Sequence, residues 1–255
     1  GYRLRFVQSF SFSFEKRRLE EPGMKVSVVI PILDSHEIVR RQLLYLNRLG
    51  LPDDVEFIFV DDGSDPPLTG EMRNLRWIYT NDKRPWTIPL ARKHGVMESS
   101  GEKLLFTDID HILTEELIHH VRATNYDIVY FKREAAVLDE NGKLTQDHKI
   151  LREYGLTEKW FERNLDLGAH GSSYAIKRDI YFKLGGQDEN AIMIHPNREN
   201  VKLRYRIRKA ITNSEIYASP VFPMIYCIPN GHFCGDRNYN PKNLFHSLKR
   251  NTVYS

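Results

Sequence analysis

The chain has 255 residues, of which 41% are hydrophobic, so it can bury the core of one domain or of two closely fused halves. Its 37 Lys and Arg residues nearly balance its 34 Asp and Glu residues, and the net charge of +3 is too small to require a nucleic-acid partner or an anionic membrane. Two cysteines, Cys227 and Cys234, are too few for a disulfide framework, so we expect a reducing, cytoplasmic compartment.

No membrane span is expected, because the longest apolar runs, such as residues 26–33, fall far short of the roughly 20 residues that cross a bilayer. The first residues lack the apolar stretch of a signal peptide. Their alternation of charged and aromatic side chains is typical of an edge strand or an arm, which we assign to residues 1–23.

From Met24 onward, short β-branched runs alternate with helix-period stretches, which predicts an α/β fold with a mostly parallel, Rossmann-like sheet flanked by helices. The predicted elements, in chain order, are a strand at 26–30, a helix at 36–49, strands at 55–60 and 75–79, a helix at 90–99 and a strand at 103–107. This first half is typical of nucleotide-binding folds.

The alternation of strands and helices is less regular after Glu115. There we predict a short helix to Arg122, a strand at 127–131, a hairpin at Asn141-Gly142 and a helix at 158–164. A basic run at 202–209 does not decide between helix and strand, and we favour a solvated helix face over a site for an acidic acceptor. No repeat or linker separates two independent domains, so a single domain is predicted.

Three predicted strands end in acidic residues, and ligands of open parallel sheets lie outside these carboxyl ends. The ends carry Asp34, the pair Asp61-Asp62, and the pair Asp108 and Asp110. Asp108 and Asp110 are two residues apart, so in an extended segment both can reach one divalent ion. Taken alone, the Asp61-Asp62 motif could be only a solvated turn, and Asp-x-Asp is better explained as an N-cap and turn before a helix at Thr114.

The order of these motifs is more specific than any one of them. The stretches KVSVVIPILDSHE, FIFVDDGSD, PLARKHGVMESSGEKLLFTDID and SSYAIKRDIYFKLGGQDE together resemble glycosyltransferase family 2 and its relatives with the GT-A fold. The resemblance covers residues 25 to about 199. It departs at Lys93, where the family usually has Asn.

The resemblance implies roles for single residues in binding a nucleotide sugar, which we assign to residues 24–122. Pro31, Asp34 and Asp62, with the adjoining Asp61, are expected near the base and ribose. Arg92 is expected near the base or diphosphate, because its planar fork suits phosphate. Asp108 is expected on the donor ribose and, together with Asp110, on the metal.

Residues 123–255 are expected to bind the acceptor and to include a C-terminal metal or lid segment. Inverting relatives commonly have Glu-Asp where this chain has Glu199-Asn200, and an amide cannot accept the acceptor's proton. Glu199 and Asp188 are therefore the alternative bases, and Asn200 favours a retaining reaction. Glu-Asn and Gly231-His232 are similar to the polypeptide N-acetylgalactosaminyltransferases, which implies that His232 completes the metal site.

These observations together predict a glycosyltransferase that uses Mn²⁺ or Mg²⁺ to move a sugar, from a UDP-sugar, to a glycan or other hydroxyl acceptor. One alternative is a nucleotidyltransferase, although the glycine-rich loop after its first strand is missing here. A non-catalytic protein that binds sugar nucleotides or glycans is the other main alternative. A DNA-modifying glycosyltransferase is a further one, testable by binding to duplex DNA.

Overall fold

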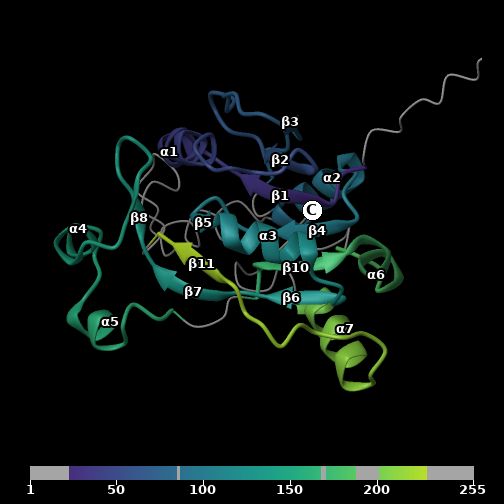
Figure 1. The fold of residues 1–255 in the computed structure, drawn as a ribbon. Helices are drawn as coiled ribbons and strands as arrows, with labels where there is room; N and C mark the ends of the chain where they lie inside the picture. The colour runs from purple at the N-terminus through teal and green to yellow at the C-terminus, as the bar shows by residue number, and fades with distance from the viewer. Residues whose placement is uncertain (1–22, 85–86, 168–170, 188–200, 229–255) are drawn as a thin grey trace, which may run out of the picture.

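The computed structural model describes residues 23–84, 87–167, 171–187 and 201–228. Its centre is a six-stranded sheet in the order β3-β2-β1-β4-β10-β6, shown in Figure 1. The strands, in chain order, are β1 (Val26–Ile32), β2 (Val55–Asp61), β3 (Leu75–Tyr79), β4 (Lys103–Phe106), β6 (Ile128–Tyr130) and β10 (Tyr174–Lys177).

The strands β1 to β4 run parallel to one another, whereas β10 lies antiparallel between β4 and β6. The predicted α/β fold with a mostly parallel sheet is therefore confirmed. Every residue of β1 and β2 is buried, which explains why both strands are apolar almost throughout rather than alternating.

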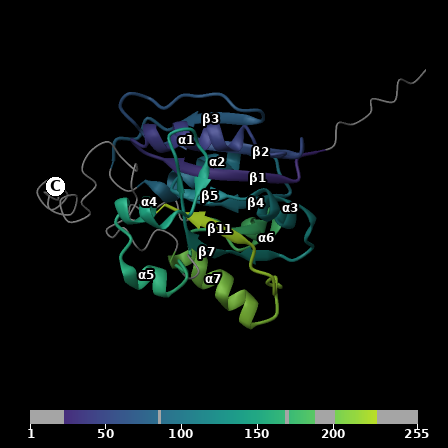
Figure 2. The ribbon, with the colours of Figure 1, turned by 60° about the vertical axis from the view of Figure 1, so that its left-hand side comes forward.

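Helices cover both faces of this sheet (Figures 1 and 2). The helices are α1 (His36–Leu46), α2 (Ile88–Glu98), α3 (Glu115–Ala123), α4 (His148–Glu153), α5 (Glu158–Glu162), α6 (Arg178–Lys183) and α7 (Val201–Thr212). The side chains of α1 and α3 share one buried cluster with the sheet, and those of α2, α6 and α7 share another. In Figure 1, α4 and α5 lie at the opposite end of the molecule from α6 and α7.

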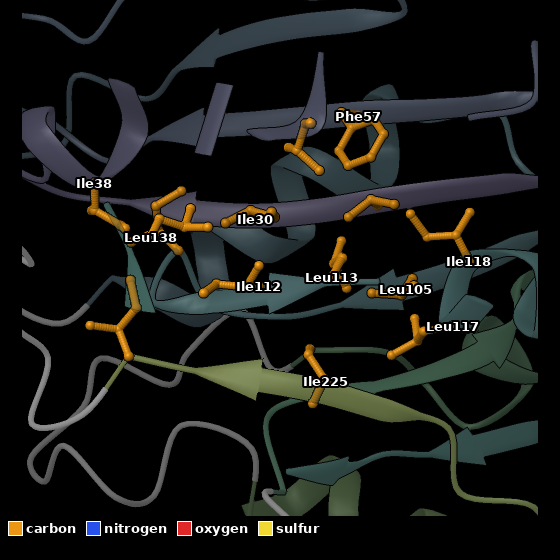
Figure 3. Close-up of a cluster of buried hydrophobic side chains, with 14 of the residues drawn as sticks. Ile30, Ile38, Phe57, Leu105, Ile112, Leu113, Leu117, Ile118, Leu138 and Ile225 are labelled. Carbon is orange, nitrogen blue, oxygen red and sulfur yellow. The ribbon is translucent and has the colours of Figure 1, made fainter. Parts of the chain in front are cut away.

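A second, three-stranded sheet packs next to the first and contains β5 (His111–Leu113), β11 (Met224–Cys227) and β7 (Lys132–Ala135). Ile112, Leu113 and Ile225 of this small sheet join Ile30 and Leu105 of the large one in a single cluster (Figure 3). The segment that follows β4 is thereby buried on its inner side. This packing fixes the polypeptide that carries Asp108 and Asp110.

The close packing of α2 on β1 depends on Gly95. A Cβ atom there would lie 2.5 Å from Val29 Cγ1, closer than van der Waals contact permits. The helix therefore approaches the sheet closely enough to bring Arg92, one turn earlier, over the strand ends.

The remaining predicted elements agree with the structure in type. The Asn141-Gly142 turn joins β8 (Val137–Leu138) to β9 (Leu144–Thr145), and the basic run 202–209 is helical in α7. The first helix ends at Leu46 rather than residue 49, because the N–H groups of Arg48 and Leu49 donate to carbonyls three residues back instead of four. Residues 1–22, and so nearly all of the predicted arm, lie outside the described residues. Within the described ranges, no helix is long and apolar enough to cross a membrane.

Candidate active site

The candidate site lies at the carboxyl ends of three neighbouring parallel strands, β1, β2 and β4. Ile32 at the end of β1 is in register with Asp61 at the end of β2, and Val29 of β1 is in register with Phe106 at the end of β4. The segments that follow these strands therefore emerge at one edge of the sheet. This edge is where an open parallel sheet binds its ligands.

Asp34 follows β1 in a left-handed conformation, with φ of 45°. Its backbone N–H donates to Ser64 Oγ at 2.9 Å, and its carboxylate accepts from the Asp65 N–H at 3.1 Å. These bonds join the end of β1 to the loop after β2. Pro31, by contrast, is a buried residue within β1, opposite Val60.

Asp61 organises the loop after β2. Its two carboxylate oxygens accept from the N–H groups of Ser64 and Leu68, both at 2.8 Å, and the residue is 2% exposed. Gly63, directly before Ser64, has a φ of 95°, and a Cβ there would stand 2.2 Å from the Asp82 carbonyl oxygen. The carboxylate of Asp61 is thus engaged in holding the loop.

Asp62 is directed toward the segment before α2. Its two oxygens accept from Thr80 Oγ1 at 2.9 Å and from Thr87 Oγ1 at 2.6 Å. Burial raises the pKa of Asp62, and this effect outweighs the hydrogen bonds from Thr87 and Thr80, which lower it. A carboxylate has about four lone-pair sites, so Asp62 retains the capacity to accept from a ligand.

Arg92 is the largest fully buried polar side chain of the described residues, and it connects α2 to the acidic segment after β4. Its Nη2 atom donates to Asp108 Oδ1 at 2.5 Å. Within the described part of the chain, its Nε and Nη1 atoms have no hydrogen-bond partner. A buried guanidinium with unsatisfied donors is costly, and the ion pair with Asp108 offsets part of that cost.

Asp108, Asp110 and His111 form a compact group at the end of β4. The His111 N–H donates to the Asp108 carbonyl at 3.0 Å, which closes a turn and brings the three side chains together. Their potential ligand atoms all lie within 4.8 Å of one another. The two aspartates are therefore adjacent because of a turn, and not because of the extended segment that we predicted.

This group has the composition of a divalent-cation site. Two oxygens that bind one Mg²⁺ at about 2.1 Å lie within about 4.2 Å of each other, so the observed spacing needs only small adjustment. The side chains of Asp108 and Asp110 are 30% and 25% exposed, which leaves the ion accessible to a further ligand. Carboxylate oxygens suit Mn²⁺ and Mg²⁺.

His111 is the site residue that our sequence interpretation missed. Its ring is buried, with Nδ1 at 3.2 Å from Asp110 Oδ1 and at 3.9 Å from Asp108 Oδ2. Burial acts to lower the pKa of His111, but the Cys227 thiol and the Asp110 carboxylate raise it and their effect prevails. Its position directly after Asp110 was the available signal in the sequence.

Four predicted site residues lie outside the described residues: Asp188, Glu199, Asn200 and His232. The described segment before residues 188–200 ends at Gln187, whose N–H donates to Tyr181 Oη at 3.0 Å. The roles of these four residues, and the similarity to polypeptide N-acetylgalactosaminyltransferases on which two of them depend, stay predictions.

Comparison with known proteins identifies the family. The family model described as "Glycosyl transferase family 2" matches residues 27–185, more than half of the chain and all of the strand-end residues from Pro31 to His111. The chain belongs to glycosyl transferase family 2. This membership confirms the family resemblance and, with the observed sheet, the GT-A fold.

Two further proteins are similar over parts of their length. The "Uncharacterized glycosyltransferase YfnE" of Bacillus subtilis (strain 168) is 29% identical over 105 residues, which are 39% of this chain and 27% of that protein. The structure of S. aureus TarS 1-349 superposes with a TM-score of 0.51 at 15% identity, covering 80% of this chain and 60% of that one. This family 2 chain therefore spans about a quarter of the first relative and 60% of the second, and the second likeness concerns the fold alone.

Proposed function

We propose that the chain is a metal-dependent glycosyltransferase that moves a sugar from a UDP-sugar to an acceptor hydroxyl. The observation that carries the proposal is the turn of Asp108, Asp110 and His111 beside buried Arg92, at the sheet edge that also holds Asp62. Family membership supports sugar transfer. A nucleotidyltransferase is disfavoured by the same membership.

Asp108, Asp110 and His111 would hold the ion, either Mn²⁺ or Mg²⁺. The ion would neutralise charge that develops on the leaving diphosphate. Asp62 can accept a hydrogen bond from a base N–H or a ribose hydroxyl, which neither threonine contact prevents. Arg92 would keep the Asp108 carboxylate in place through its hydrogen bond from Nη2.

The proposal also covers the division of the chain between donor and acceptor, its compartment and one further metal ligand. We assign residues 24–122 to the donor and residues 123–255 to the acceptor, and we expect a cytoplasmic protein. His232 is a further candidate ligand. Loss of Mn²⁺ affinity in His232→Ala is expected if it binds the ion, and an unchanged affinity would remove it from the site.

The stereochemistry of transfer depends on the residue that receives the acceptor's proton. Because Asn200 cannot receive it, we propose retention, in which a departing phosphate oxygen can take the proton. Proton NMR of the first product should show the donor's anomeric configuration. An inverted product would contradict this assignment and point to Glu199 or Asp188 as the base.

The experiment that tests the function is a thermal-shift panel of nucleotide sugars with Mn²⁺ and with EDTA, followed by donor hydrolysis with the sugar that binds. A ligand that binds only the folded state raises the melting temperature, so a UDP-sugar should give the largest shift and only with Mn²⁺. Binding without any hydrolysis or transfer would favour the non-catalytic alternative. The absence of any shift would contradict the proposal.

A further inference from the structure

The turn that carries Asp108, Asp110 and His111 is held by a side chain from a distant part of the sequence. Gln42 lies on the buried face of α1 and is 3% exposed. Its Nε2 atom donates to the Ile109 carbonyl at 3.0 Å and to the His111 carbonyl at 2.9 Å. Both hydrogens of the amide nitrogen are therefore used on the same turn.

The Asp110 carbonyl, which lies between those of Ile109 and His111, also accepts a hydrogen bond from outside the turn. The Ile228 N–H, just beyond β11, donates to the Asp110 carbonyl at 2.8 Å. Three successive carbonyls, those of residues 109, 110 and 111, thus accept hydrogen bonds from α1 on one side and from the end of β11 on the other. The backbone that orients the Asp110 and His111 side chains is fixed at each peptide.

The chemistry of Gln42 suits this location. It replaces an apolar residue in the buried stripe formed by Ile38, Val39, Leu43 and Leu46, where a polar group is costly unless it is hydrogen-bonded. A lysine or arginine could donate to the same carbonyls, but its positive charge would repel a cation held by the turn. A neutral amide supplies two donors without that repulsion.

We propose that Gln42 is a positioning residue for the metal site: it acts through the backbone of the turn to hold Asp110 and His111 in the arrangement that binds the ion. This inference rests on the proposed function, because it assumes that the turn binds a divalent cation. Residues that orient metal ligands commonly contribute a factor of roughly 10 to 100 to metal affinity.

The test compares Gln42→Met, which keeps the approximate length of the side chain but removes both donors, with the matched control Asn74→Gly. Asn74 makes the same kind of contact at the other end of the sheet, where its Nδ2 donates to the carbonyls of Asp53 and Val55 at 3.0 and 3.2 Å. Glycine tolerates its φ of 57°. Both variants lose one amide that bridges two carbonyls, so both are expected to melt at a lower temperature.

Mn²⁺ affinity of the folded protein, measured from the electron paramagnetic resonance signal of free Mn²⁺, separates the two variants. We expect Gln42→Met to weaken Mn²⁺ binding by roughly 10-fold or more. We expect Asn74→Gly to bind Mn²⁺ as the wild type does. Should Gln42→Met fail to fold, Gln42→Asn keeps a buried amide but shortens its reach by one methylene, and it should also weaken Mn²⁺ binding.

Two different results would overturn the inference, and they can be told apart. Wild-type Mn²⁺ affinity in folded Gln42→Met, or in Gln42→Asn where that variant is the one that folds, would return Gln42 to a structural role and leave the proposed function intact. Absence of Mn²⁺ binding in the wild type itself would remove the metal from the proposed function and Gln42's role with it.

Discussion

Asp61 and Asp62 are neighbours in the chain, yet their carboxylates serve different purposes. Asp61 uses both oxygens on backbone N–H groups of its own loop, whereas Asp62 faces two threonine hydroxyls that a ligand or water can supplement. The sequence motif identified the pair. It could not predict which aspartate holds the loop and which can accept from a ligand, because this depends on the direction of each side chain at the end of β2.

Replacing Asp62 by alanine is expected to weaken UDP binding more than it lowers turnover at saturating donor. A base or ribose contact is made equally in the ground and transition states, so its loss raises KM and leaves kcat nearly unchanged. A loss of roughly 10-fold in affinity corresponds to about 1.4 kcal/mol. Calorimetry that finds wild-type UDP affinity would remove Asp62 from the site.

Asp61→Asn is expected to act on stability, because an amide can accept only one of the two backbone bonds. The cost is about 1 to 3 kcal/mol for the donor left unpaired. For a domain of this size that is roughly 2 to 12 °C in melting temperature, which differential scanning calorimetry measures. A variant that melts like the wild type would show that water replaces the bond.

At the scale of elements, the sequence indicated the parallel strands and their helices because their apolar periods are strong and local. It did not indicate β5 or β10. β5 has three residues and pairs with β11, more than a hundred residues later, and β10 is recognisable as a strand only between β4 and β6. His111 was missed as a ligand for the same reason, since β5 determines where it points.

Arg178 joins α6 to the end of α2, far from the strand ends. It donates to the carbonyls of Val96 and Gly101 and to Ser99 Oγ, at 3.2, 2.6 and 2.7 Å. The Val96 carbonyl also accepts from the Ser99 hydroxyl, but the Gly101 carbonyl and Ser99 Oγ would lose a charged donor, so Arg178→Ala should cost about 2 to 3 kcal/mol of stability. UDP affinity should stay unchanged, and a parallel loss of affinity in calorimetry would show that α2 and the site are coupled.

In the whole molecule, residues 24–122 and residues 123–255 build one sheet and one core. The first half supplies β1 to β4, but β10 and β6 complete the same sheet, and Leu138 and Ile225 complete the cluster around Ile30 (Figure 3). The sequence predicted a single domain from the absence of a linker. The shared core provides the physical reason.

This shared core predicts cooperative unfolding. Denaturant titrations followed by tryptophan fluorescence and by far-ultraviolet circular dichroism should give coincident single transitions. Two separated transitions would instead indicate that residues 24–122 and 123–255 fold as independent units.

We propose that Asp108, Asp110 and His111 hold a divalent ion that binds the donor's diphosphate. Calorimetric UDP affinity for the wild type and for Asp110→Ala, each with Mn²⁺ and with EDTA, tests this role. We predict that Mn²⁺ strengthens UDP binding to the wild type and has no such effect on Asp110→Ala, while the melting temperature of the variant without ligands stays near that of the wild type. Equal UDP affinity for both proteins in Mn²⁺ and in EDTA would show that these residues do not bind the donor through an ion.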